Sequence, residues 1–170
     1  MSTTTAPTTA GGTRAVRVEY INPFIESVSE LFSTMLGAKA KRGQVTLAGA
    51  TDAGPCVMAL IGLSGPARGN VALSFPADTV RKIVGQLFGA EPADINEDVT
   101  DAVAEMANIV AGGAKARLKN DATPIDLGLP TVVVGNEYTV MNPSQASWIE
   151  IPFTTEFGPF ALRVTFEFEE

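Results

Sequence analysis

The sequence predicts an α+β domain in which an antiparallel or mixed sheet carries long helices on one face. Three observations favour this class: long segments with apolar residues at helical spacing, several short apolar or alternating runs, and Gly/Pro turns between those runs. The chain has 170 residues, 45% of them hydrophobic, which is enough apolar material for one domain with a substantial core. We expect that single domain to occupy residues 14–170.

The first elements are a tail and a helix. Residues 1–13 are rich in Thr, Ala and Gly without apolar periodicity, which predicts a disordered tail. A helix is expected to begin at Asn22–Pro23, with Asn as N-cap and Pro at the first helical position, and to stop at Gly37. Its apolar stripe consists of Phe24, Ile25, Val28, Leu31, Phe32, Met35 and Leu36.

Three strands are expected next, at Gln44–Ala48, Cys56–Leu63 and Gly69–Phe75. They are separated by Gly/Pro turns at Ala53–Pro55 and Ser64–Pro66. Because such short connections cannot contain a crossover, they favour antiparallel pairing of consecutive strands.

Two helices and three further strands complete the domain. One helix is expected over Pro76–Phe88, ended by Gly89. A longer helix is expected over Asn96–Lys119, whose acidic first turns and basic last turns suit the helix dipole. A strand at Thr131–Gly135 follows, and then a C-terminal hairpin whose last strand alternates apolar and polar residues, as a half-buried strand does. The hairpin strands are Trp148–Thr154 and Phe160–Phe168.

Composition excludes several kinds of chemistry. The chain has no histidine and a single cysteine, which excludes histidine-dependent catalytic units, an intrachain disulfide and a cysteine metal cluster. Cys56 lies in an apolar run, so we expect a buried and inert thiol. A formal charge of −7 disfavours nucleic-acid binding. The absence of a long apolar run or a signal-peptide pattern predicts a cytoplasmic protein without membrane contact.

The long helix carries the most informative residues. At 100° per residue, its outward face contains Asp101, Glu105, Asn108, Gly112, Lys115 and Lys119. Asn is a poor residue in the middle of a helix, and each glycine of the pair Gly112–Gly113 costs roughly 1 kcal/mol relative to alanine. Two structural explanations stay open: Gly113 admits another helix of this chain, and Asn108 is merely solvated. The functional alternative is a docking surface for another protein, made of an exposed acid, an exposed amide and bare glycine backbone.

The segment Glu105–Lys115 resembles the E-x-x-N…G-x-A-K helix of the CheC/CheX/FliY chemotaxis phosphatases. The first helix, Asn22–Gly37, resembles CheX in particular, as do the strand Gly69–Phe75 and the segment Leu129–Gly135. The resemblance extends in order from about Val16 to Phe168, and it implies the CheC-like fold.

The resemblance also implies an activity, which is the removal of phosphate from the aspartyl-phosphate of a CheY-type response regulator. Asn108 would orient the attacking water, and Glu105 would pair with the regulator's lysine. On the same face, Asp101, Gly112 and Lys115 are expected to contact the phosphorylated regulator. Mg²⁺ is expected in the regulator. Phosphoryl transfer needs mainly positioning and electrostatics from this chain, so the resemblance implies that it binds no metal or cofactor of its own.

One site per chain is expected. The first helix offers Glu26-x-x-Ser29, or Ser29 and Phe32 in an alternative register, and neither register pairs Glu with Asn. The single-site relatives pair through their sheets, so the resemblance implies a homodimer.

Two other functions remain open. The first is a non-catalytic assembly module resembling the middle domain of flagellar switch proteins, in which Glu105 and Asn108 would be incidental. The second is a small-molecule enzyme, which is disfavoured because its candidate polar residues have no recognised spacing. Those candidates are Asp52, Asp78, Lys82 and Lys115.

Overall fold

The computed structural model describes residues 18–48, 50–120, 124–140 and 148–168. The predicted tail at residues 1–13 lies outside the described residues. Within them the helices are α1 (Val18–Met35), α2 (Ala77–Phe88) and α3 (Glu97–Asn120). The strands are β1 (Lys41–Arg42), β2 (Thr46–Ala48), β3 (Ala50–Ser64), β4 (Ala67–Pro76), β5 (Asp126–Leu127), β6 (Thr131–Val140), β7 (Trp148–Thr155) and β8 (Gly158–Phe168).

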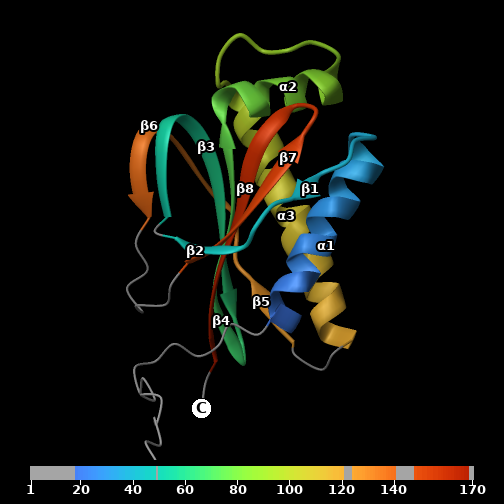
Figure 1. Cartoon of the computed structure of the whole chain (residues 1–170), viewed down its shortest axis with the longest axis vertical. Helices are drawn as coiled ribbons and strands as arrows, with labels where there is room; N and C mark the ends of the chain where they lie inside the picture. Colours follow the sequence, from blue (N-terminus) through green and yellow to red (C-terminus); the bar gives the residue numbers. More distant parts are fainter. Residues whose placement is uncertain (1–17, 49, 121–123, 141–147, 169–170) are drawn as a thin grey trace, which may run out of the picture.

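These strands form one antiparallel sheet in the order β1-β7-β8-β4-β3-β5, with β2 also beside β7 and β6 also beside β3. Helices α1 and α3 lie side by side across one face of the sheet, and α2 covers its upper end in Figure 1. The predicted α+β class, with an antiparallel sheet and long helices on one face, is therefore confirmed. Among the described helices, none is long and apolar enough to cross a membrane.

The main core fills the space between the helices and the sheet. At its centre the ring of Phe160 in β8 stacks on three others, Phe32, Phe75 and Phe153, with centroids 4.9, 5.0 and 5.1 Å away. Burying a phenyl side chain stabilises a fold by about 1.5–3 kcal/mol. Because these rings come from α1, β4, β7 and β8, the stack fixes the first helix against the middle of the sheet.

The opposite face of the sheet carries a smaller apolar cluster around Met58, Ala72 and Trp148. On this face the polar side of β8 is buried, with Arg163 4% and Thr165 0% exposed, so the predicted half-buried strand is wrong. Neighbouring strands supply partners for both residues. Arg163 pairs with Glu150 of β7 at 3.4 Å, and the Thr165 hydroxyl accepts the backbone N–H of Asn70 at 2.9 Å. Polar residues in this central strand are therefore compatible with burial.

The first helix extends further than predicted, because α1 already runs from Val18 and contains Pro23. Its added turn packs on the sheet: the ring of Tyr20 lies 6.2 Å from Phe166 of β8, and Ile21 is buried. Phe24, in the next turn, lies 5.7 Å from the same ring. Because Pro23 lies beyond the first turn of α1, it removes one internal hydrogen bond and its ring crowds the carbonyl four residues earlier. The packing of this extra turn offsets that loss, so the predicted start at Asn22–Pro23 is wrong.

The predicted turn at Ala53–Pro55 is also wrong. These residues lie inside β3, where the register against β6 shifts between Ala53 and Cys56, as at a β-bulge. A bulge accommodates a proline without an N–H and a glycine with φ of 81°. The strand before it therefore pairs with β7 instead of β3.

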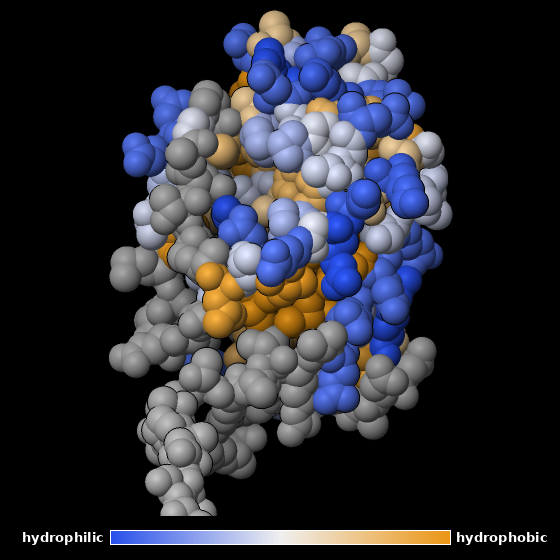
Figure 2. Space-filling model, in the orientation of Figure 1, coloured by the Kyte–Doolittle hydropathy of each residue, from blue (hydrophilic) through white to orange (hydrophobic). Residues whose placement is uncertain are grey.

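Other boundaries agree more closely with the sequence. Helix α2 ends at Gly89, whose φ is 84° and whose N–H donates to the carbonyl of Gly85. The side chain of Asn96 caps α3 by accepting the Val99 N–H at 3.1 Å. Strand β6 is longer than predicted, because its second half pairs with the part of β3 before the bulge. Cys56 is buried, as expected. In the space-filling view, apolar surface is visible just below the crossing strand β2, whose Leu47 is exposed (Figure 2).

Candidate functional site

Helix α3 is held against the sheet by one apolar side. The residues predicted to face inward are all buried: Val99, Val103, Met106, Val110 and Ala114. This fixes the rotation of the helix about its axis, and the opposite side therefore faces solvent. Asp101, Glu105, Asn108 and Gly112 are all exposed, as predicted. We call these four residues the α3 outer face.

Glu105 and Asn108 occupy the middle of the α3 outer face. They are three residues apart on a regular helix, so their side chains are neighbours. Neither side chain makes a hydrogen bond or an ion pair with any described residue. An acid and an amide without internal partners can meet an incoming molecule without first breaking a contact in this chain.

The two adjacent glycines of α3 have different environments. A Cβ at Gly113 would collide with the Ser27 side chain of α1, whose hydroxyl donates to the Ile109 carbonyl at 3.5 Å. The explanation that Gly113 admits another helix is therefore confirmed. A Cβ at Gly112 would meet nothing within 4 Å. Packing within the described chain therefore does not require a glycine at position 112, and Gly112 weakens the helix by roughly 1 kcal/mol relative to alanine.

Lys115 lies at the border of the α3 outer face, where it pairs with Asp126 of β5 at 3.8 Å. The Lys115 side chain is 43% exposed and that of Asp126 81%, so solvent screens the pair and it adds little stability. The Lys115–Asp126 pair draws the lysine toward the sheet. The α3 outer face therefore stays acidic, with Asp101 and Glu105. The sequence did not point to Asp126, because the segment around it carries no periodic pattern.

The first helix presents its acids differently. Glu26 and Glu30 both pair with Arg117 of α3, and Glu26 does so at 3.3 Å. Arg117 also donates to the Gly113 carbonyl at 3.1 Å, so it bridges the two helices at their closest approach. The acid of the Glu26-x-x-Ser29 pattern is therefore engaged inside the chain, unlike Glu105.

The residues considered for a small-molecule site do not converge. Asp78 pairs with Arg81 on α2, Lys82 is exposed on the same helix, and Lys115 pairs with Asp126. The side chain of Asp52 lies outside the described set. Among the described residues, no group of three or more His, Cys, Asp or Glu side chains is placed to hold a metal ion.

Comparison with known proteins gives a consistent result. The family model described as "Chemotaxis phosphatase CheX" matches residues 57–154. The CheY-P phosphatase CheX of Thermotoga maritima is 27% identical over 121 residues, which cover 71% of this chain and 78% of that protein. A CheC-like superfamily protein from Shewanella sp. PV-4 has a TM-score of 0.82 at 33% identity, covering 88% of this chain and 98% of its own. The chemotaxis protein CheX from Vibrio vulnificus has a TM-score of 0.80 at 31% identity, covering 88% and 99%.

More distant structures share the fold. A chain from the CheX-CheY-BeF3-Mg complex of Borrelia burgdorferi has a TM-score of 0.70 at 20% identity, covering 89% of this chain and 99% of its own. The middle domain of FliM from Vibrio alginolyticus has a TM-score of 0.58 at 12% identity, covering 89% and 92%. Because the fold recurs in proteins with different names, it does not by itself decide the activity.

Proposed function

The chain belongs to the chemotaxis phosphatase CheX family, and from this premise we propose that it hydrolyses the aspartyl-phosphate of a CheY-type response regulator. The observation that carries the proposal is the α3 outer face, where Glu105 and Asn108 are exposed neighbours without internal partners. The names of two relatives support it. The Thermotoga protein is called a CheY-P phosphatase, and the Borrelia structure is a complex of CheX with CheY, BeF3 and magnesium.

Asn108 is the proposed catalytic residue. Its carboxamide oxygen can accept a hydrogen bond from water and its amide nitrogen can donate one, so the group can hold a water for in-line attack on phosphorus. It removes no proton. Its contribution is to hold the water in position. Positioning the attacking group removes a large part of the activation free energy of phosphoryl transfer. Mg²⁺ belongs to the regulator in this scheme and neutralises charge on the phosphate.

Glu105, one turn before Asn108, is the proposed positioning residue, which fixes where Asn108 sits in the regulator's active site. Its carboxylate has no cation of its own among the described residues, so it can pair with the lysine of the regulator's phosphorylation site. A charged hydrogen bond of this kind fixes direction as well as distance. Asp101 extends the acidic surface toward the start of the helix. Gly112, one turn after Asn108, leaves backbone open to close approach, and Lys115 borders this surface.

We further propose that the protein acts as a cytoplasmic homodimer joined through sheet edges. Strand β6 supports this arrangement, because among the described strands it pairs with β3 alone. Val134 of β6 is also 53% exposed. An unpaired edge with an exposed apolar residue is a surface that proteins usually cover.

The activity is tested by phosphate release from phosphorylated CheY-type regulators of the same organism. Wild-type protein should accelerate release, and Asn108→Ala should reduce the acceleration by about a hundredfold, the scale for loss of one positioned catalytic group. Gln86→Ala removes an exposed amide from α2 and should match the wild type. An Asn108→Ala effect below twofold would contradict the catalytic role. Absence of acceleration with every regulator would favour the assembly module.

A further inference from the structure

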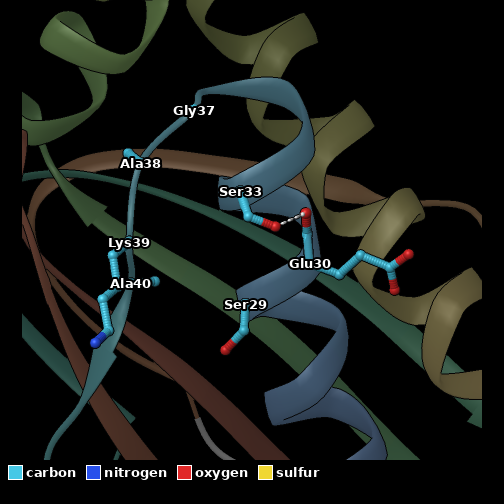
Figure 3. Close-up of a pocket in the computed structure, with 7 residues that line it drawn as sticks. All are labelled: Ser29, Glu30, Ser33, Gly37, Ala38, Lys39 and Ala40. Atoms are coloured by element: carbon cyan, nitrogen blue, oxygen red, sulfur yellow. Dashed lines mark hydrogen bonds between the residues drawn. The ribbon is translucent and has the colours of Figure 1, made fainter.

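A second surface feature lies away from the α3 outer face. A groove of about 630 Å³ runs between the C-terminal half of α1 and the segment 37–40 that leads into β1 (Figure 3). Small residues form much of both walls: Ser29 and Ser33 on the helix, and Gly37, Ala38 and Ala40 across from them. The groove therefore has room for an extended chain beside the helix.

One wall of the groove continues into a free strand edge. β1 is the first strand of the sheet, and β7 is its partner among the described strands. The Gly43 N–H donates to the Pro152 carbonyl at 2.7 Å. Because bonded residues alternate along an antiparallel ladder, Ala40 and Arg42 direct their N–H and C=O groups away from β7. These backbone groups can pair with an added strand.

The same edge is strongly basic. Lys39, Lys41 and Arg42 are all exposed, and they are three of the 12 Lys and Arg residues in a chain of net charge −7. None of the three pairs with an acid in the described part of the chain. Ala38 and Ala40 are buried between them, so Lys39 and Lys41 project from the face opposite to α1.

We propose that this groove binds an extended acidic segment of a partner protein, which pairs with β1 as an additional strand. Strand addition of this kind takes its affinity from backbone hydrogen bonds and its specificity from alternate side chains. Acidic residues at every second position would oppose Lys39 and Lys41. The intervening side chains would face Ser29 and Ser33, which favours small or apolar residues there.

A second copy of this chain fits the edge poorly. A twofold pairing of β1 with itself would place the basic residues of one copy opposite those of the other. Like charges directly opposite on neighbouring strands are destabilising. An acidic segment removes this repulsion and supplies partners for Lys39 and Lys41, which have none among the described residues.

The test is selection of random dodecapeptides, displayed on phage, on the full-length protein. We expect selected peptides to carry Asp or Glu at alternating positions. For a fluorescent synthetic copy of a selected peptide, the double variant Lys39→Glu/Lys41→Glu should weaken binding at least about tenfold, because both opposing charges are reversed. The control Lys82→Glu changes an exposed lysine on α2 and should stay within twofold.

Three results would overturn the proposal: no selected peptide, peptides without acidic bias, or equal binding to the double variant. A change of oligomeric state in the double variant would also overturn it, in favour of a second copy at the edge. The proposal does not rest on the phosphatase assignment. The double variant lies outside the α3 outer face and should release phosphate from the regulator at the wild-type rate.

Discussion

The exposed faces of α1 and α3 contain similar residues in different environments. Both helices carry an acid followed three residues later by a small polar residue, and the two helices cross in contact at Ser27 and Gly113. On α1 the acid, Glu26, is held by Arg117. On α3 the acid, Glu105, has no partner among the described residues. A partner that brings a lysine would therefore find an available carboxylate on α3 and one already paired with an arginine on α1.

This difference explains how a fold with two similar helices can present one site. Arg117 pairs with both acids of α1, Glu26 and Glu30, and stabilises the contact between the helices, so the α1 acids are used for structure. The α3 outer face keeps a mid-helix asparagine, together with an acid that lacks a partner and a glycine that packing does not require among the described residues. Each of these costs stability or gives none. Residues that lower stability without an internal function are typical of functional sites.

The largest expected effect comes from added bulk on the α3 outer face. Gly112→Leu should weaken binding of a regulator loaded with beryllofluoride by about a hundredfold or more, because the new side chain stands where the partner's backbone approaches. Thr34→Leu adds similar bulk to an exposed position of α1 and should change binding less than twofold. Titration by fluorescence anisotropy measures both. Equal binding by Gly112→Leu and wild type would show that the partner approaches elsewhere.

Replacing the acid of each helix by alanine should have different effects, on activity for α3 and on stability for α1. Glu105→Ala should lower both regulator affinity and phosphate release by about tenfold, the scale of one lost charged hydrogen bond. Glu26→Ala should leave phosphate release unchanged and lower the free energy of unfolding by at most about 1 kcal/mol, because its pair with Arg117 is partly exposed. Reduced phosphate release by Glu26→Ala with normal stability would contradict a purely structural role for the α1 acid.

The adjacent glycines should respond to alanine with opposite signs. Gly112→Ala should raise the free energy of unfolding by up to about 1 kcal/mol, because it improves helix propensity in open space. Gly113→Ala should lower it by about 1 kcal/mol, because the collision with Ser27 outweighs the same gain. Urea unfolding measures both. Ser27→Ala should partly restore the stability lost in Gly113→Ala. If Gly113→Ala instead raised the free energy of unfolding, close approach of α1 would not explain the glycine at this position.

The smallest effect is expected at Arg117. Arg117→Ala should cost about 1 kcal/mol of folding free energy or less, because its partners Glu26 and Glu30 are well exposed. It should not change phosphate release, since the α3 outer face keeps its own residues. High salt should lower the stability of the wild type toward that of the variant. A variant that gained activity would indicate that Arg117 suppresses a second site on α1.

The α3 outer face was predictable because its determinants are local. A cap at Asn96, helical periodicity and an inward apolar side fix which residues point outward, and the resemblance of Glu105–Lys115 to a family motif adds their roles. The errors arose where distant residues decide the structure. The bulge at Gly54–Pro55 depends on β6 lying opposite, and the extra turn before Pro23 depends on Phe166. Likewise, the engagement of Lys115 by Asp126 and of Glu26 by Arg117 requires the folded chain.

The most direct test of this account asks which helix meets the regulator. The photo-cross-linking amino acid p-benzoylphenylalanine is placed at Asp101 of α3 or at Thr34 of α1, both exposed positions. Each protein is then irradiated with a CheY-type regulator in which beryllofluoride mimics the phosphoryl group. We expect a covalent adduct from position 101 and none from position 34. An adduct from position 34 alone would contradict docking of the regulator on the α3 outer face.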